Sequence, residues 1–114
     1  MIDFACKKFN LDEIIKCGLG LSRSDYSILS FLIKNKKEFS SNEVSSKTGF
    51  DLSTSQRTLK KLRELNLVSR RQVNLVSGGY IYYYQSKKKE EISKKILEIV
   101  NNWSKKVEME LESW

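Results

Sequence analysis

The side chains best suited to directed recognition lie together in residues 53–61, which read STSQRTLKK. Amide and guanidinium groups can form paired hydrogen bonds with adenine or guanine edges, so we expect Gln56 and Arg57 to contact bases. Hydroxyls at a helix start can bind phosphate, the role we expect for Ser53 and Thr54. We expect Lys60 and Lys61 to bind phosphate. The alternative is that this is an ordinary amphipathic helix whose basic face is only solvated. The predicted contact residues are Ser53, Thr54, Ser55, Gln56, Arg57, Lys60 and Lys61.

The positive charge of the chain is concentrated around these residues. The 114 residues include 21 Lys and Arg against 14 Asp and Glu, a net charge of +7. Residues 53–89 hold nine bases and one acid, or +8, whereas residues 1–52 stand at +1 and residues 90–114 at −2. An excess this local favours an acidic partner such as nucleic acid.

The chain lacks the residues that enzymes usually need for catalysis. The chain has no His, which removes the commonest general acid–base group and most zinc sites. It also has no paired-carboxylate motif and no Gly-rich phosphate loop. Cys6 and Cys17 fit no metal or redox motif, and we expect two free, partly buried thiols, with a redox-sensing pair as the alternative. We therefore expect no enzyme activity, no metal and no cofactor.

The cellular location follows from two further absences. No apolar run reaches the length of about 18 residues that a transmembrane helix needs. The first 15 residues, MIDFACKKFNLDEII, lack the basic and then apolar order of a signal peptide. We expect a cytoplasmic protein without a membrane partner.

Four patterns mark the starts of helices. A Ser or Asn that can accept from a free backbone N–H is followed three residues later by Asp, Glu or Gln. The pairs are Asn10 and Glu13, Ser22 and Asp25, Ser40 and Glu43, and Ser53 and Gln56. Apolar spacing after them predicts a short helix that ends at Gly18 to Gly20, a second helix, a third over about 41–47 and a fourth over about 54–66.

A change of period after the fourth helix predicts a β-hairpin. Residues 67–75 and 80–84 are rich in β-branched and aromatic residues and flank Ser77, Gly78 and Gly79. Arg70 and Arg71 lead toward the turn and would lie along a phosphate backbone or enter a minor groove, or else remain solvated.

Three of the hairpin's tyrosines fall on one face. Alternation groups Tyr80, Tyr82 and Tyr84 together, opposite Ile81 and Tyr83. We expect these rings to pack on the core, because one face of the hairpin must cover the helices. Stacking on RNA bases is the alternative.

The final segment predicts one long amphipathic helix over 90–114. Its apolar residues recur in steps of three and four and form one stripe. Two tryptophans on that stripe would be costly to leave in water, so we expect a dimerisation helix in an antiparallel or crossed pair, with the N-terminal segment packed on it. Folding back on its own domain is the alternative. The expected dimerisation residues are Ile92, Ile96, Val100, Trp103, Val107, Leu111 and Trp114.

The order of these elements is that of a winged helix-turn-helix. Residues 40–66 give a short helix, a turn with Gly49 and a second helix, and the hairpin adds a wing. The stretch FSSNEVSSKTGFDLSTSQRTLKKLRELNLVSRRQ with GGYIYYY resembles the winged-helix domain of MarR-like and TrmB-like transcription regulators, especially compact archaeal ones. Asn66 stands where that family usually has Gly, and Asn also accepts a left-handed backbone. The resemblance covers about residues 22–85.

Together these features predict a mainly α fold with a small β-hairpin. We expect an N-terminal helical segment over 1–21, a winged helix-turn-helix domain over 22–88 and a dimerisation helix over 89–114. The +8 segment on the helix-turn-helix and hairpin, together with the C-terminal stripe, leads us to expect a homodimeric transcriptional regulator that binds specific double-stranded DNA, with the recognition helix in the major groove. A winged-helix module for protein–protein assembly is the alternative. The operator, any small-molecule effector and the sign of regulation stay open.

Overall fold

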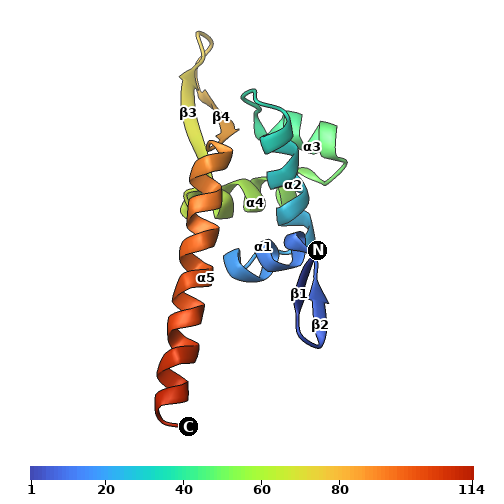
Figure 1. Cartoon of the computed structure of the whole chain (residues 1–114). Helices are drawn as coiled ribbons and strands as arrows, with labels where there is room; N and C mark the ends of the chain where they lie inside the picture. The colour runs from blue at the N-terminus through green and yellow to red at the C-terminus, as the bar shows by residue number, and fades with distance from the viewer. The chain divides into compact units, whose positions relative to one another are not determined.

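The computed structural model describes residues 1–114 and divides them into two compact units. Ser22–Lys88 form the first unit, and Met1–Leu21 with Lys89–Trp114 form the second. Figure 1 shows the elements in chain order. They are β1 (Ile2–Phe4), β2 (Lys7–Phe9), α1 (Leu11–Leu19), α2 (Arg23–Lys34), α3 (Ser41–Thr48), α4 (Leu52–Glu64), β3 (Val68–Asn74), β4 (Tyr80–Ser86) and α5 (Lys89–Glu112).

The core of the first unit is built where α2, α3 and α4 meet the hairpin. Apolar residues at helical spacing on each helix point inward, and the start of β3 adds two more. Burial of such side chains is the main favourable term in folding. The fully or almost fully buried residues are Ile28, Leu29, Leu32, Val44, Leu59, Leu62, Leu67 and Val68.

Two of the four predicted helix starts are confirmed in atomic detail. The Ser22 N–H donates to Asp25 Oδ2 at 3.0 Å, and the Asp25 N–H donates to Ser22 Oγ at 3.2 Å. Ser40 and Glu43 make the equivalent reciprocal pair at 3.0 and 3.2 Å. Each pair satisfies two backbone groups that the helix leaves without a partner.

The other two predicted starts are confirmed only in part, because one has the predicted capping residue without its hydrogen bond and the other has a different capping residue. Asn10 precedes α1, but its side chain makes no capping bond. Helix α4 begins two residues before the predicted Thr54, because Asp51 caps it through a 2.7 Å bond from the Thr54 N–H to Asp51 Oδ1. The Ser53 hydroxyl donates to the same carboxylate at 3.2 Å, so Ser53 lies inside the first turn.

One carboxylate joins α2 to α4. Asp25 Oδ1 accepts from the Thr58 hydroxyl at 2.8 Å, and Asp25 Oδ2 accepts from Lys61 Nζ at 2.7 Å. Burial by itself raises the pKa of the Asp25 carboxyl, but the hydrogen bonds from Lys61, Ser22 and Thr58 outweigh it and lower the pKa from 3.8 to about 2. The carboxylate is therefore charged at neutral pH and holds the two helices together.

The predicted wing is confirmed, with β4 two residues longer than expected. Strands β3 and β4 pair antiparallel from Val68 opposite Ser86 to Asn74 opposite Tyr80. The turn needs a left-handed backbone at Gly78 and Gly79, where φ is 98° and 80°. Asn66, just before the hairpin, also takes the left-handed form with a φ of 59°, as the sequence allows.

The second unit differs from the predicted N-terminal helical segment. Strands β1 and β2 form a hairpin before α1, with Ala5 in its turn at a φ of 51°. Cys6 follows in that turn, and both cysteines are free and exposed rather than partly buried. Helix α1 contacts α5 as expected, and a methyl group placed on Gly18 would lie 3.5 Å from Ile99 Cγ2. None of the helices has both the length and the apolar character needed to cross a lipid bilayer.

Replacement of Asp25 tests its role in joining the two helices. We expect Asp25→Asn to lower the free energy of unfolding by about 1–3 kcal/mol, because Lys61 loses its charged partner while the helix cap is kept. Urea denaturation at pH 7 measures this difference. Glu43→Gln is the matched control, since Glu43 caps α3 without an ion pair, and its effect should be clearly smaller.

Acid should remove the stabilisation that the Asp25 carboxylate gives to the folded chain. Its pKa is lower in the folded chain than the ordinary 3.8, so its stabilisation is present above about pH 4 and is lost as the pH falls through about 2. The gap in stability between wild type and Asp25→Asn should narrow over that interval. A gap that stays constant from pH 5 to pH 2 contradicts the assignment.

Candidate nucleic-acid interface

Helix α4 exposes most of the predicted contact residues. Ser53, Gln56, Arg57 and Lys60 are exposed, and Thr54 is half-buried. The opposite face carries the buried Leu59 and Leu62. The Arg57 guanidinium lies 3.4 Å from the Thr54 hydroxyl, to which Nη2 donates. This face offers amide, hydroxyl and cationic donors from Ser53 to Lys60, within a helix of 13 residues.

Ser55 is a correction to the predicted set. Its side chain is fully buried and its hydroxyl has no hydrogen-bond partner. The reason is spacing, because Ser55 precedes Leu59 by four residues and Leu62 by seven and therefore shares their inward face. Ser55 cannot contact a partner on the outside of α4.

Asp51 changes the electrostatics at the start of α4. The pKa of its carboxyl is lowered by the hydrogen bond from the Thr54 N–H, with further bonds from the Thr54 and Ser53 hydroxyls. A negative charge therefore occupies the helix end that we expected to bind phosphate through Ser53 and Thr54. Their hydroxyls and the Thr54 N–H already donate to Asp51, so a phosphate would have to compete with it.

Two of the predicted cationic contacts are already paired with acids from earlier in the chain. Lys61 is 41% exposed and forms the 2.7 Å ion pair with Asp25. The Nε of Arg71 donates to Glu38 Oε2 at 3.0 Å, and the Arg71 guanidinium lies 5.7 Å from the Tyr83 ring centre. Their charges are partly compensated within the unit, which leaves Arg57 and Lys60 as the predicted cations of α4 that form no ion pair.

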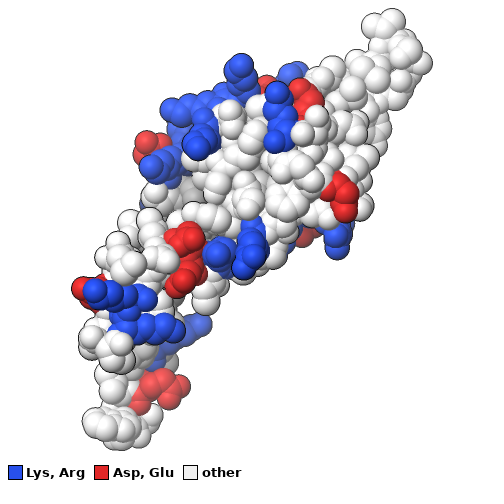
Figure 2. Space-filling model, turned by 90° about the vertical axis from the view of Figure 1, so that its right-hand side faces the viewer, with Lys and Arg blue, Asp and Glu red and all other residues white.

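The wing arginines lie at the base of the hairpin and not at its tip. Arg70 and Arg71 stand opposite Tyr84 and Tyr83, near the end where β3 begins. The Arg70 guanidinium stacks 3.8 Å from the centre of the Tyr82 ring. Residues 72–86 contain no charged side chain, and Figure 2 shows the extended tip of this hairpin without Lys, Arg, Asp or Glu atoms.

The tyrosines of β4 are less buried than the core packing that we expected. Tyr80 is 56% exposed, while Tyr82 and Tyr84 are half-buried. Tyr84 does connect to the helical core, because its backbone exchanges two hydrogen bonds with Phe39 at 2.8 and 2.9 Å. The expectation therefore holds in part for Tyr82 and Tyr84 and is wrong for Tyr80.

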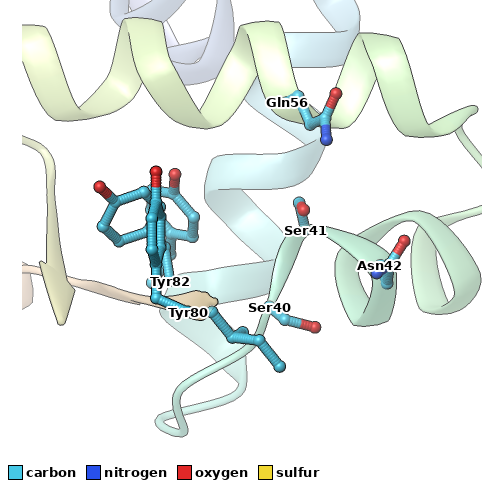
Figure 3. A pocket seen from close by; sticks show the side chains of 8 residues that line it. Ser40, Ser41, Asn42, Gln56, Tyr80 and Tyr82 are labelled. Atoms are coloured by element: carbon cyan, nitrogen blue, oxygen red, sulfur yellow. The ribbon is translucent and has the colours of Figure 1, made fainter. Parts of the chain in front are cut away.

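These tyrosines line a pocket that sequence reasoning missed. Its volume is about 270 Å³. Figure 3 shows the rings of β4 on one side, the amide of Gln56 on another and the first turn of α3 on a third. Alternation grouped the tyrosines on one face, but nothing in the sequence named the residues opposite them. The lining residues are Ser40, Ser41, Asn42, Gln56, Tyr80, Ile81, Tyr82 and Tyr84.

The predicted dimerisation stripe is split between buried and exposed residues. Ile92 is buried and Ile96 is half-buried, so the side chain of neither is fully available to a second copy of the chain. The exposed part of the stripe begins at Val100 and continues to the last residue, where Trp114 is 98% exposed. A groove of about 540 Å³ runs beside Trp103, Val107, Leu111 and Trp114.

Two archaeal proteins are similar to this chain over most of its length. A Methanosarcina mazei Go1 protein named "possible transcriptional regulator" has a structure with a TM-score of 0.95 and 36% identity, covering 100% of this chain and 96% of its own. The Methanocaldococcus jannaschii protein MJ1503 is 32% identical over 98 residues, which cover 86% of this chain and 74% of its own length.

A more distant structure supports the fold alone. It is the homodimeric winged helix-turn-helix DNA-binding domain Mb0332 of Mycobacterium bovis, with a TM-score of 0.53 and 20% identity over 90% of this chain and 91% of its own. The predicted winged helix-turn-helix is thus confirmed, whereas the TrmB-like part of the resemblance stays a prediction. The sequence pattern of the MarR family matches residues 19–83. The chain therefore belongs to the MarR family of winged helix-turn-helix regulators.

Proposed function

We propose that this chain is a transcriptional regulator that binds specific double-stranded DNA as a homodimer. The observation that carries the proposal is the exposed donor face of α4, which includes Gln56, Arg57 and Lys60, within a segment of nine bases and one acid. A helix of this size fits the major groove, and its outward donors can reach base edges. The wing would lie on the backbone or in the minor groove.

The roles of the cations follow from their partners. Arg57 has a long, exposed side chain and no ion pair, so it is the best candidate for bidentate contact with guanine. Lys60 is exposed and suits a phosphate contact. Lys61 and Arg71 would contribute less to DNA binding, because Asp25 and Glu38 already hold them. Arg70 keeps its charge at the wing while its guanidinium rests on Tyr82.

The homodimer rests on α5 and on a structural neighbour. The neighbour from Mycobacterium bovis is homodimeric. In this chain the exposed residues Trp103, Val107, Leu111 and Trp114 follow one another at helical steps. An apolar stripe of that kind on a monomer marks an interaction surface, and an identical stripe on a second copy would cover it. Two copies would then meet a pseudo-palindromic site with half-sites about one helical turn apart.

Replacement of Arg57 separates base contact from phosphate contact. Arg57→Ala should weaken binding to a selected duplex by about 10–100-fold, because a bidentate contact with a base contributes about 1–3 kcal/mol. Binding to a mixed-sequence duplex should fall much less. Fluorescence anisotropy on both duplexes measures the two losses. Equal losses would make Arg57 a phosphate contact instead.

Salt dependence separates DNA binding from the assembly alternative. Phosphate contacts release counterions, so the logarithm of the affinity should fall linearly with the logarithm of salt, by about 0.9 per contact. Duplex binding that stays flat between low and moderate salt, or no duplex binding at all, would favour the module for protein–protein assembly.

A double substitution on α5 tests the homodimer. Trp103→Ala together with Leu111→Ala should shift the chain from the mass of two copies to that of one, because both side chains leave the exposed stripe. Light scattering after size exclusion measures the mass. Met109→Ala is the control, since Met109 is 68% exposed on the same helix but lies off the stripe. An unchanged dimer in the double variant would exclude this surface.

A further inference from the structure

We infer that the pocket beside Gln56 holds one phosphodiester unit of the bound DNA strand, and that Gln56 contacts this backbone unit rather than a base. The inference rests on the proposed DNA binding and assigns a ligand to this pocket. It also gives the tyrosines of β4 a function that core packing does not explain.

The pocket collects hydrogen-bonding groups from three elements of one compact unit. Helix α4 contributes the amide of Gln56, α3 contributes Ser41 and Asn42, and β4 contributes the hydroxyls of its tyrosines. Figure 3 shows Gln56 directed toward the first turn of α3 and the tyrosine rings standing between β4 and α4. The side chains of Gln56, Ser41 and Asn42 make no hydrogen bond within the chain, so these groups can bind a ligand.

The chemistry of the lining suits a singly charged, elongated group. No acidic side chain lines the pocket, and the carboxylate of the nearby Glu43 is engaged by the Ser40 N–H. Arg70 does not line the pocket, but its guanidinium lies 3.8 Å from the centre of the Tyr82 ring, which does, so this cation is one ring away. Several neutral donors with one cation match the two phosphate oxygens of a diester, and the tyrosine rings offer apolar surface to the sugar.

This geometry separates Gln56 from Arg57. Adjacent helix residues point about 100° apart, and Arg57 does not line the pocket but donates to Thr54. Gln56 therefore faces the wing side of α4, where a strand leaving the major groove would pass. Base readout then falls on Arg57, and Gln56 positions the strand.

The experiment combines variants with single neutral linkages in the DNA. A duplex selected from random sequence and a mixed-sequence duplex are each bound by wild type and by Gln56→Ala. We expect Gln56→Ala to weaken both by the same factor, about tenfold, as the loss of a hydrogen bond to a charged group implies. On the selected duplex, a methylphosphonate at one position should abolish this difference, because the contact partner is then missing.

Matched variants test the other residues that line the pocket. Ser41→Ala and Tyr82→Phe should each weaken both duplexes and lose their effect at the same neutral linkage. Ser46→Ala on the exposed side of α3 and Tyr83→Phe on the other face of β4 should leave binding unchanged. Circular dichroism melting of each variant shows whether a loss reflects unfolding, and a variant with lowered stability is replaced by Gln56→Glu, whose negative charge should repel the phosphate.

The possible failures point to different claims. A change in the preferred base at one position in Gln56→Ala would make Gln56 a base reader and overturn this inference while leaving the proposed function intact. A loss of affinity in Gln56→Ala that no single neutral linkage removes would also overturn it. Absence of any duplex binding by wild type would overturn both.

Discussion

The Asp25 carboxylate is the interaction on which the presentation of α4 depends. It accepts from the Ser22 N–H in its own helix and from Thr58 and Lys61 in α4. Burial of a charge is unfavourable unless the charge is fully hydrogen-bonded, and these donors offset the free energy of desolvating the carboxylate. Because Thr58 and Lys61 lie one turn apart, the carboxylate fixes the rotation of α4 about its axis as well as its distance from α2.

That rotation decides which residues of α4 can meet a partner. With Thr58, Leu59 and Leu62 inward, Gln56, Arg57 and Lys60 must point outward, and Ser55 must be buried. Tertiary contacts also limit how much of the positive charge is available to a partner. Lys61 and Arg71 belong to the segment of +8, yet their acids, Asp25 and Glu38, lie outside it. Part of the charge of the segment therefore stabilises the fold, and the proposed DNA contact would rest on fewer cations than the composition suggests.

Local features of the fold were predictable because their causes are local in sequence. The reciprocal caps at Ser22 with Asp25 and at Ser40 with Glu43 lie within one turn, and the wing needs only alternation and two glycines. The start of α4 was misjudged because Asp51 competes with Ser53 for the same free amides. The β1–β2 hairpin was missed because its turn is Ala5 and Cys6, and neither residue is typical of a left-handed turn.

The site was harder to predict because its contacts join distant positions. The outward face of α4 follows from the spacing of Leu59 and Leu62, but the pairing of Lys61 spans 36 positions, and that of Arg71 spans 33. The pocket depends on the registration of β4 against α3 and α4, which alternation along β4 alone does not specify. Sequence reasoning therefore supplied the candidate side chains, and tertiary packing decided which of them are free.

The central claim is that two copies of this chain read one duplex through α4. The most direct measurement is selection of bound sequences from random duplex DNA, followed by light scattering of the complex with the enriched site. We expect a two-fold symmetric site with half-sites about one helical turn apart and a complex of two chains per duplex. Recovery of no common sequence, or of a single unsymmetric site that carries one chain, would contradict it.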